Sequence, residues 1–357
     1  MKRQTRSMIL GLALVFVLSG CGISVQSNNS NTASGIDGGI FRTDNKGANW
    51  VSKSLMPTIS GRAGSFASVD GNMIYFDPTD PKTVYFGTVG EGLLYSYDRG
   101  DTWQRSAALG RVTVRGLVVD PQFRCTIYAA VDNKILKTVD CGRAWAQVYY
   151  DNDVSLKISA LVMNPSDNSL VAGTSRGEIM KSLDRGDSWQ VITRLKDKVA
   201  EIKISPFDSK VMLVAGEKTG LHRSIVGSSS LESLANNMKT FVKANTFKDL
   251  TFSGSTSGLV FLANGYGILQ SPDNGTTWSK INLLTPDANA TINALAVSPK
   301  NDSEIYYVTN TTFYRSLDGG KNWTSKKLPS NRAGAVLMIA PDLPATVYMA
   351  VKQLQKK

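Results

Sequence analysis

Short apolar stretches alternate with turns rich in Gly, Pro, Asp and Asn along most of the chain. Several units contain a Pro turn followed by a short run of β-branched and aromatic residues, as in Val84-Tyr85, Ile127-Tyr128 and Ile305-Tyr306. Runs of this length, bounded by such turn residues, predict strands. The order within a unit is strand A, Pro turn, strand B, short loop, strand C, Asp-containing turn and strand D.

A motif of Ser/Thr-x-Asp-x-Gly-x-x-Trp recurs between strands C and D. Five copies keep the aspartate, and in a sixth copy Asn45 takes its place. A seventh unit, near Gly220 to Ser224, keeps the strand and loses the Asp, the Gly and the Trp. The motif residues are Asn45, Asp98, Asp140, Asp184, Asp273 and Asp318, with Trp50, Trp103, Trp145, Trp189, Trp278 and Trp323.

The spacing of the motifs sets the number of repeats. Consecutive tryptophans lie 53, 42, 44, 89 and 45 residues apart, so the long interval holds two units. Seven units of about 46 residues fit the length of a four-stranded propeller blade. The first unit has only strands C and D, from Gly39 to Trp50, and the chain ends on A-like and B-like strands at 336–340 and 347–351. We therefore predict an all-β, seven-bladed β-propeller that closes by pairing of its C-terminal and N-terminal strands.

The motif resembles the Asp-box of bacterial neuraminidase (BNR) repeat proteins, over residues 38–352. The families that share it include sialidases, xyloglucanases, sortilin-like receptors and photosystem II assembly-factor-like propellers. The resemblance implies that the boxes are folding elements on the rim, away from the ligand face. In such a turn the carboxylate accepts backbone N–H bonds, the Gly takes a positive φ, and the Trp fills the space beneath.

The resemblance also raises an enzymatic alternative. A sialidase needs an arginine triad and a Tyr/Glu pair, and it shows Arg-Ile-Pro near the first repeat, where this chain has Phe41-Arg42-Thr43. Xyloglucanase-like enzymes place a cleft between two propellers, and this chain has the length of one. The carboxylates of Asp151 and Asp153 are expected to be solvated in a loop. We predict a protein that is not an enzyme, with a glycan-active hydrolase or lectin as the alternative and a structural envelope scaffold as a third reading.

The N-terminus has the layout of an export signal. Lys2, Arg3 and Arg6 precede an apolar stretch, and the sequence Leu18-Ser19-Gly20-Cys21 resembles the lipobox of bacterial lipoproteins. We expect residues 1–20 to be a signal peptide, Cys21 to carry the lipid, residues 21–36 to be a Ser/Asn-rich tether, and residues 37–357 to form a single propeller domain. The predicted location is the bacterial cell envelope, anchored to a membrane and facing the periplasm or the exterior.

Composition excludes several kinds of site. With one histidine and three cysteines, the chain lacks the ligands for a multi-residue zinc, haem or iron–sulfur site, so we expect no metal and no cofactor. The full chain has 40 Lys and Arg against 29 Asp and Glu. In an exported protein this moderate surplus suggests an acidic partner and not nucleic acid, although it is also an ordinary aid to solubility.

The face formed by the B–C loops and the D–A connections is the expected recognition face, because the Asp-boxes occupy the other one. Basic residues exceed acidic residues in its connections, where Lys203 and Lys248 stand with Glu201 and Asp249. Arg115 precedes Pro121 by six residues, where other blades have small or amide side chains, and arginine suits carboxylate recognition. The candidate partner-binding residues are Arg62, Arg111, Arg115, Arg194, Lys196, Lys198 and Arg332. We expect a monomer that binds an envelope or membrane protein with an acidic surface, as an assembly or scaffold factor.

A disulfide between Cys125 and Cys141 is predicted from hairpin geometry. If Asn133 is the centre of the B–C hairpin of the third unit, Cys125 and Cys141 face each other directly. Opposed residues in a non-hydrogen-bonded pair have Cα atoms about 4.5 Å apart, within the range of a disulfide. A register shifted by one residue would put the two on opposite faces.

Overall fold

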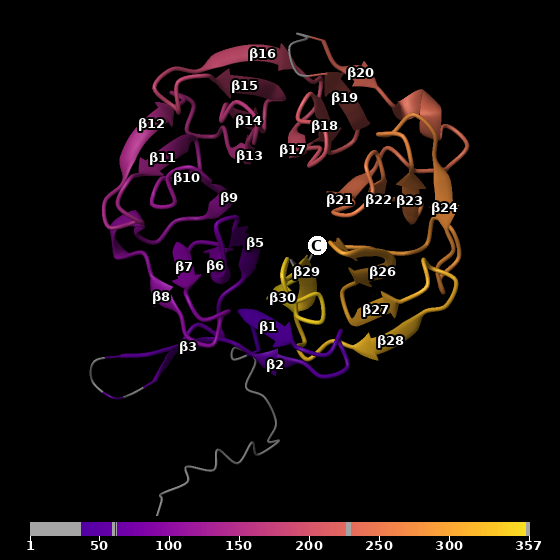
Figure 1. Cartoon of the computed structure of the whole chain (residues 1–357), viewed down its shortest axis with the longest axis horizontal. Helices are drawn as coiled ribbons and strands as arrows, with labels where there is room; N and C mark the ends of the chain where they lie inside the picture. The colour runs from indigo at the N-terminus through magenta and orange to yellow at the C-terminus, as the bar shows by residue number, and fades with distance from the viewer. Residues whose placement is uncertain (1–36, 59–60, 62, 226–229, 355–357) are drawn as a thin grey trace, which may run out of the picture. The chain divides into compact units, whose positions relative to one another are not determined.

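The computed structural model describes residues 37–58, 61, 63–225 and 230–354. Within these residues the chain forms thirty strands and two short 3-10 helices. Seven four-stranded antiparallel sheets surround a common axis (Figure 1), which confirms the seven-bladed β-propeller. The predicted signal peptide, Cys21, the tether and Arg62 lie outside the described residues, so the export and anchoring expectations stay predictions.

The blade that closes the ring combines both ends of the domain. From the axis outward, blade 1 consists of β29 (Ala333–Ile339), β30 (Val347–Lys352), β1 (Ile40–Thr43) and β2 (Val51–Ser52). β1 pairs with β30 in the register Ile40 to Ala350 and Thr43 to Val347. This is the predicted closure, and it leaves no open sheet edge between the first and last blades.

The other six blades are each formed by consecutive strands, again from the axis outward. Blades 2 to 4 are β5 (Gly71–Asp77), β6 (Asp80–Thr88), β7 (Leu93–Ser96) and β8 (Gln104–Arg105); β9 (Val114–Val119), β10 (Ile127–Val131), β11 (Lys134–Thr138) and β12 (Ala146–Tyr150); and β13 (Ile158–Met163), β14 (Leu170–Thr174), β15 (Glu178–Ser182) and β16 (Gln190–Arg194). Blades 5 to 7 are β17 (Val199–Ile204), β18 (Val211–Gly216), β19 (Gly220–Ile225) and β20 (Glu232–Ser233); β21 (Phe247–Phe252), β22 (Val260–Asn264), β23 (Ile268–Ser271) and β24 (Ser279–Ile281); and β25 (Ala294–Ser298), β26 (Asn301–Val308), β27 (Thr312–Ser316) and β28 (Thr324–Lys327).

Two small additions lie in the connections between blades. The hairpin of β3 (Leu55–Met56) and β4 (Gly64–Ser65) follows β2, and the 3-10 helices are η1 (Ala107–Leu109) and η2 (Ala235–Met238). No helix among the described residues is long and apolar enough to cross a membrane.

The core lies between neighbouring blades. Strand B of blades 3 to 6 is buried along its whole length, because it has a blade on either side. The outermost strand is largely exposed, as in β12 and β16. One apolar cluster joins Ile40, Phe86, Trp103 and Tyr348 from blades 1 and 2. Each blade is therefore stabilised mainly by its neighbours.

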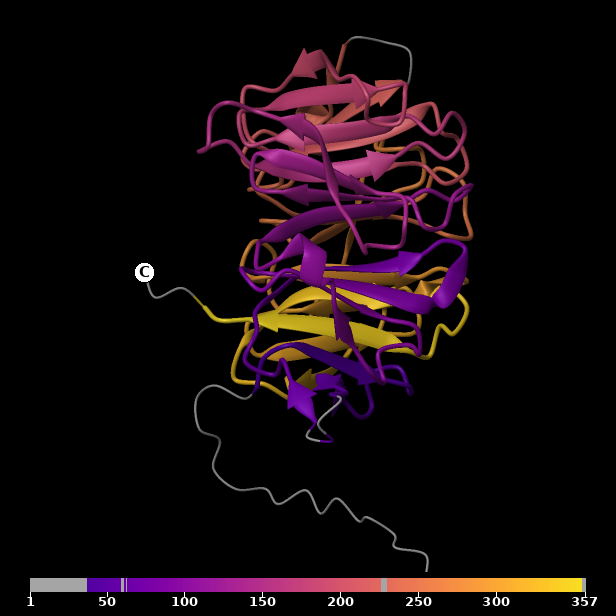
Figure 2. The ribbon, with the colours of Figure 1, turned by 90° about the vertical axis from the view of Figure 1, so that its left-hand side faces the viewer.

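The strands run between two faces, which Figure 2 shows edge-on. The B–C loops and the D–A connections form one face, called here the loop face, from which β30 emerges on the left of the figure. The A–B turns and the C–D turns form the other face, called here the box face. This is the arrangement expected from the strand order.

The box turns have the same hydrogen bonds in each blade that keeps the motif. In blade 2, the N–H of Gly100 donates to Ser96 Oγ over 2.7 Å, and Ser96 Oγ donates to Asp98 Oδ1 over 2.7 Å. The N–H of Thr102 also donates to Asp98 Oδ1 over 2.9 Å. Arg99 and Gly100 have φ values of 61° and 82°, so the turn needs residues that tolerate the left-handed region. Asn45 accepts the equivalent backbone bond, from Asn49 over 2.8 Å, which explains why the first copy functions without an aspartate.

The motif tryptophans differ in burial. Trp103 is 1% exposed and donates from Nε1 to the carbonyl of Gly100 over 3.0 Å. The other five are partly exposed. Trp103 therefore fills the space beneath its turn as expected, and the rest cover theirs only in part.

Residues that follow strand D of blade 5 pack against the next blade. Leu234 and Met238, beside and on η2, are buried and belong to one apolar cluster with Trp278 of blade 6. The side chain of Asn237 donates to the carbonyl of Thr276 in the box turn of blade 6 over 2.8 Å. The helical turn after β20 therefore supports the box turn of the following blade.

The box turns also connect neighbouring blades. In four blades a cation on strand C donates to the carbonyl of the residue after the box Asp or Asn in the next blade: Arg42 to Arg99, Lys137 to Arg185, Arg223 to Asn274, and Arg315 to Lys46. In three blades that residue is itself a cation, and it pairs with a carboxylate of the preceding blade: Arg99 with Asp342, Arg185 with Asp120, and Lys46 with Glu304. Much of the positive charge on the box face is therefore used between blades.

Cys125 and Cys141 form a disulfide with Cα atoms 4.1 Å apart. The pairing was predicted, but the register used to derive it was wrong. β10 and β11 pair Val131 with Lys134 and Ile127 with Thr138, which puts Cys125 one residue out of direct opposition to Cys141. The bond forms because Cys141 lies beyond the ladder, in the box turn, where its φ of 59° bends the chain back. Its N–H donates to the carbonyl of Cys125 over 3.1 Å.

Candidate functional site

The candidate cations of the loop face fall into different environments. Arg332 is 6% exposed and bonds to Asp70, Asp37 and the carbonyl of Ser68. The distance from Arg332 Nε to Asp37 Oδ1 is 3.5 Å. This buried arginine joins the last connection to the first, so it is a structural residue and is not presented to a partner.

Three other candidates are paired with glutamates of the B–C loops. The N···O distances are 2.8 Å for Arg194–Glu178, 3.6 Å for Arg111–Glu91 and 3.4 Å for Lys198–Glu217. The comparison of basic and acidic residues in the sequence was made for the D–A connections, and these glutamates lie outside them. The positive surplus of the loop face is accordingly smaller than expected.

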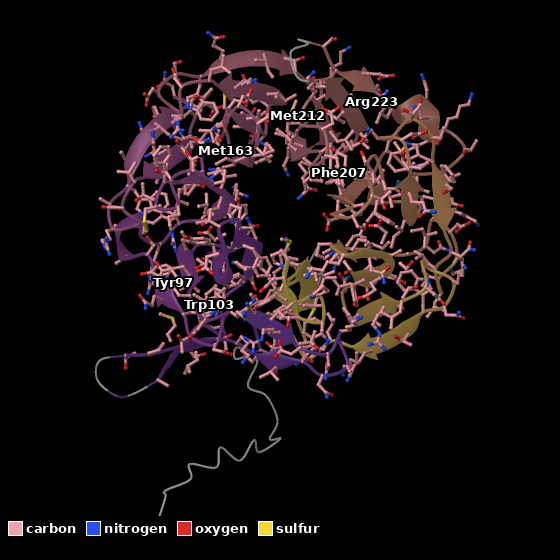
Figure 3. The ribbon with its side chains drawn as sticks, viewed as in Figure 1. Tyr97, Trp103, Met163, Phe207, Met212 and Arg223 are labelled. Atoms are coloured by element: carbon pink, nitrogen blue, oxygen red, sulfur yellow. A yellow bond between two sulfur atoms is a disulfide. The ribbon has the colours of Figure 1, made fainter. Side chains whose placement is uncertain are left out.

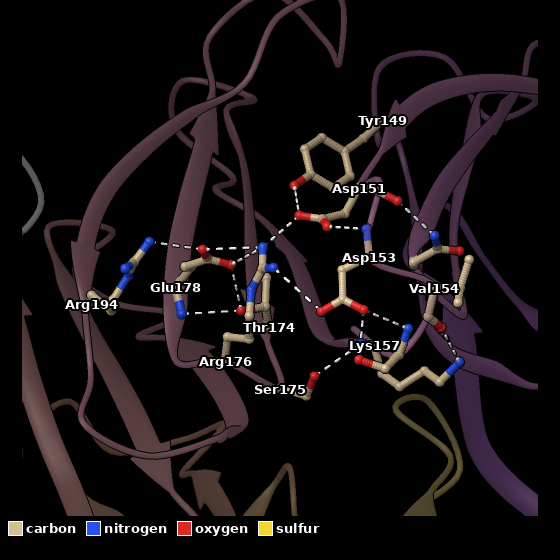
Figure 4. A network of polar contacts seen from close by, with 12 residues as sticks. Tyr149, Asp151, Asp153, Val154, Lys157, Thr174, Ser175, Arg176, Glu178 and Arg194 are labelled. Carbon is tan, nitrogen blue, oxygen red and sulfur yellow. Dashed lines mark hydrogen bonds and ion pairs between the residues drawn. The ribbon is translucent and has the colours of Figure 1, made fainter.

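A dense polar network covers the loop face at blades 3 and 4 (Figure 4). Arg176 contacts Asp151 at 2.6 Å, Asp153 at 3.5 Å and Glu178 at 3.4 Å. Sequence reasoning did not single out Arg176 and treated the two aspartates as solvated. Both carboxylates contact one guanidinium, and the side chain of Asp153 remains 41% exposed, so they form part of an ion-pair network on the loop face.

Lysines without carboxylate partners gather at the loop face of blades 4 to 6. Lys196, Lys218 and Lys248 are exposed, and none of them has an ion pair within the described part of the chain. The nearby carboxylate of Asp197 is already used, because it accepts the backbone N–H groups of Lys218 and Thr219. We call these three lysines, together with Lys198, which is paired with Glu217, the loop-face lysines.

Arg115 occupies a bulge near the start of its inner strand. The register between β9 and β10 shifts there, and the same shift occurs at Asn72 and Ser159 in blades 2 and 4. Asn72 and Ser159 each donate to a carbonyl of the next blade, to Val114 over 2.8 Å and to Val199 over 2.5 Å. Arg115 Nε is buried and has no hydrogen-bond partner among the described residues. Arg115 Nε therefore does not make the bond to the next blade that Asn72 and Ser159 make at the same bulge.

Charged side chains also line the axis at blades 5 and 6. Glu201 and Lys203 lie on β17, 2.8 Å apart, and Asp249 lies on β21. The side chains of Glu201 and Lys203 are 23% and 41% exposed, so solvent reaches them. The sequence analysis assigned these three residues, with Lys248, to the connections, whereas the structure places them on the inner strands. We call Glu201, Lys203 and Asp249 the axial cluster.

The two carboxylates of the axial cluster are in different electrostatic environments. Burial, and then the carboxylate of Glu201, raise the pKa of Asp249 to about 7. The N–H groups of Leu295 and Leu250, which donate to Asp249 over 2.7 and 2.8 Å, act in the opposite direction. Glu201 raises the pKa of Lys203, which keeps the ammonium charged. Asp249 therefore becomes charged only near neutral pH, beside the ion pair of Glu201 and Lys203.

The described residues contain no group of three or more His, Cys, Asp or Glu side chains arranged to hold a metal ion. His222, the single histidine, lies on β19, and burial lowers its pKa.

Comparisons with known proteins place the fold. No protein-family model and no curated protein sequence matches the chain. Among solved structures it is similar to YCF48 bound to a D1 peptide, with a TM-score of 0.62 and 17% identity over 85% of this chain and 96% of that chain. For YCF48 from Cyanidioschyzon merolae the TM-score is 0.57 and the identity 13%, over 79% and 95% of the two chains.

An enzyme is among the similar structures as well. The GH74 enzyme of Niastella koreensis matches with a TM-score of 0.62 and 16% identity, over 79% of this chain and 51% of that chain. This chain therefore spans about half the length of that enzyme. At these identities the comparisons establish the propeller fold, which both non-enzymatic and enzymatic proteins use.

Proposed function

We propose that this chain is a lipid-anchored, non-enzymatic β-propeller of the bacterial cell envelope that binds a protein partner through its loop face, as an assembly or scaffold factor. The observation that carries the proposal is the group of loop-face lysines, of which Lys196, Lys218 and Lys248 have no ion pair among the described residues. Exposed cations without local compensation attract a partner that supplies carboxylates.

Two further features support this function. The sequence has an export signal followed by a lipobox-like segment, which would hold the propeller close to a membrane. The chain is also similar in fold to YCF48, a protein whose structure was solved with a bound D1 peptide. The likeness covers nearly the whole of that protein, so a single propeller of this size is sufficient for binding a peptide.

The test is capture of partners from detergent-solubilised envelope membranes by the mature protein. The variant Lys196→Glu/Lys248→Glu reverses two unpaired charges on the loop face. Its matched control, Lys210→Glu/Lys321→Glu, makes the same change in net charge at two exposed lysines of the box face. We expect the first variant to lose the captured protein and the control to retain it, with equal melting temperatures. Equal capture by the two variants would contradict binding through the loop face.

The axial cluster favours a second candidate, a glycoside hydrolase. Glu201 and Asp249 are two carboxylates at the axis, and burial together with the charge of Glu201 raises the pKa of Asp249 to about 7, which suits a general acid. Hydrolysis of xyloglucan or of a sialoside by the mature protein, lost in both Glu201→Gln and Asp249→Asn, would establish this activity. Absence of hydrolysis across those substrates supports the binding function.

A further inference from the structure

Exposed apolar side chains occur in several turns of the box face, and a group of three lies at blades 2 and 3. Large side chains are exposed there: Tyr97 is 53% exposed, Phe123 is 53% exposed and Val139 is 69% exposed. Tyr97 lies toward the outer part of blade 2 (Figure 3). Tyr97 and Val139 follow the first residue of their boxes, and Phe123 lies in the A–B turn of blade 3. Exposed apolar groups that lie close together on a folded surface are typical of interaction sites.

Two arginines in the same place are not used for the fold. Arg124 and Arg143 are exposed, and within the described part of the chain neither guanidinium has a hydrogen bond or an ion pair. Both act on Tyr97: burial and Tyr95 raise the pKa of Tyr97, and the charges of Arg143 and Arg124 oppose that rise. This coupling places the two guanidinium groups close to the exposed ring. We call Tyr97, Phe123, Arg124, Val139 and Arg143 the arginine–aromatic patch.

A groove of about 530 Å³ is lined by three residues of the patch, Phe123, Arg124 and Val139. Arg185 covers the ring of Phe123 at 4.5 Å from its centre. The described residues that line the groove include three cations and no carboxylate: Gln122, Phe123, Arg124, Cys125, Thr126, Lys137, Val139 and Arg185. The groove therefore combines three positive charges with the apolar side chains of Phe123 and Val139.

The disulfide lies beneath this groove and positions both arginines. Cys125 follows Arg124 directly, and Cys141 precedes Arg143 by two residues. The bond joins the A–B turn to the box turn of blade 3, so each arginine is held on a tethered turn. In blades 1, 2 and 4 the position of Cys141 is occupied by a cation that pairs with the preceding blade. Blade 3 has a cysteine at this position, so it lacks that ion pair and has a disulfide at the groove.

We infer that the arginine–aromatic patch binds an acidic peptide segment of a partner, one that also carries aromatic or aliphatic side chains. The cations without partners require carboxylates, and arginine with tyrosine is the composition of binding hot spots. A small anion would leave Tyr97, Phe123 and Val139 uncovered, whereas a peptide can cover them and satisfy Arg124 and Arg143 together. This site lies on the face opposite to the loop-face lysines, so it is separate from the proposed function.

The test uses a set of short synthetic peptides of equal length and equal Phe and Leu content, whose net charge runs from acidic through neutral to basic. Binding to the mature protein is measured by fluorescence anisotropy at low and high salt. We expect the acidic peptides to bind most tightly, with affinity that falls as salt rises. Arg124→Glu/Arg143→Glu should weaken this binding by roughly tenfold or more, because two attractions become repulsions.

Controls separate this site from general charge and from the loop face. Lys210→Glu/Lys321→Glu changes the net charge equally on the same face, and Lys196→Glu/Lys248→Glu changes it on the loop face; both should leave the affinity for the acidic peptide within about twofold. Cys125→Ser/Cys141→Ser should weaken binding if the disulfide positions the arginines. Hydrogen exchange should slow at residues 120–126 and 137–143 when the peptide is bound.

Three results would overturn the inference. These are binding of no peptide in the set, equal binding of acidic and basic peptides, and an equal loss in the arginine variant and in the Lys210/Lys321 control. Failure of the loop-face experiment, by contrast, leaves the peptide measurements unaffected.

Discussion

The two faces of the propeller differ in how far they follow the repeat. On the box face, the same bonds of Ser or Thr, of Asp or Asn, and of Gly recur in six turns, and cations of one blade bond to the next. On the loop face, the connections vary from the four residues between β16 and β17 to the long segment between β2 and β5 that carries its own hairpin. Regular side chains serve the fold. Side chains without a structural partner occur at positions of the repeat where other blades have a bonded or a small residue: Arg115 and Lys248 occupy the repeated bulge of the inner strand, and Arg143 lies in a box turn.

The largest effect is expected for Trp103→Ala. The ring is buried and packs edge-on against Phe66 and Phe86 at centroid distances of 5.7 and 6.0 Å. Its removal should lower the free energy of unfolding by about 3–5 kcal/mol. Trp323→Ala is the control, because this partly exposed ring should cost clearly less. Chemical denaturation of both variants decides, and equal losses would show that burial does not distinguish the two boxes.

Arg332→Met tests whether this arginine of the loop face stabilises the fold, as the paired cations of the box face do. The substitution leaves Asp37 and Asp70 without their cation, and removing one partner of a buried ion pair is strongly destabilising. Since both carboxylates retain some contact with solvent, we expect a loss of about 2–4 kcal/mol. Partner capture per folded molecule should not change. A variant with normal stability and no capture would instead make Arg332 a binding residue.

Leu234→Ala tests the blade without a box. Leu234 is fully buried against Trp278, and truncation of a buried leucine costs about 2–4 kcal/mol. Because Leu234 packs beneath the box turn of blade 6, its loss should weaken the contact between blades 5 and 6. Native-state hydrogen exchange of residues 220–245 gives the local measure. A loss below about 1 kcal/mol would show that blade 5 is held together by its strands alone.

The sequence predicts the fold because the repeat is carried by short-range chemistry. Ser96, Asp98 and Gly100 form their turn from residues within a few positions of one another, so their spacing reports the turn directly. The axial cluster was misplaced because Lys203 and Asp249 lie at strand ends, where a boundary set by sequence is uncertain by several residues. The pairing of Arg194 with Glu178 and the arginine–aromatic patch depend on contacts between separate loops, which no spacing in the sequence encodes.

The last comparison, and the one that separates the two regions by sign, is the dependence of stability on pH. On the box face, hydrogen bonds from Ser188 and Ser182 lower the pKa of Asp184 to about 2, below the value in the unfolded chain. Its contribution to stability is therefore present above the unfolded value of 3.8 and is lost as the pH falls toward 2. At the axis the pKa of Asp249 is raised to about 7, so the folded state holds a proton that the unfolded chain releases from 3.8 upward.

Stability contributed by Asp249 is accordingly lost as the pH rises between about 4 and about 7. Asp249→Asn should flatten the stability profile in that window, whereas Asp184→Asn should flatten it only below about 4. Asparagine has one acceptor oxygen for the two N–H groups of Leu295 and Leu250, so the variant also loses stability by an amount that does not vary with pH. The quantity to compare is therefore the slope of stability against pH. Glu201→Gln removes the neighbouring negative charge and should move the Asp249 window to lower pH. Denaturation midpoints measured from pH 3 to pH 8 give these slopes, and an unchanged slope in Asp249→Asn would show that the axial carboxylate is already ionised throughout.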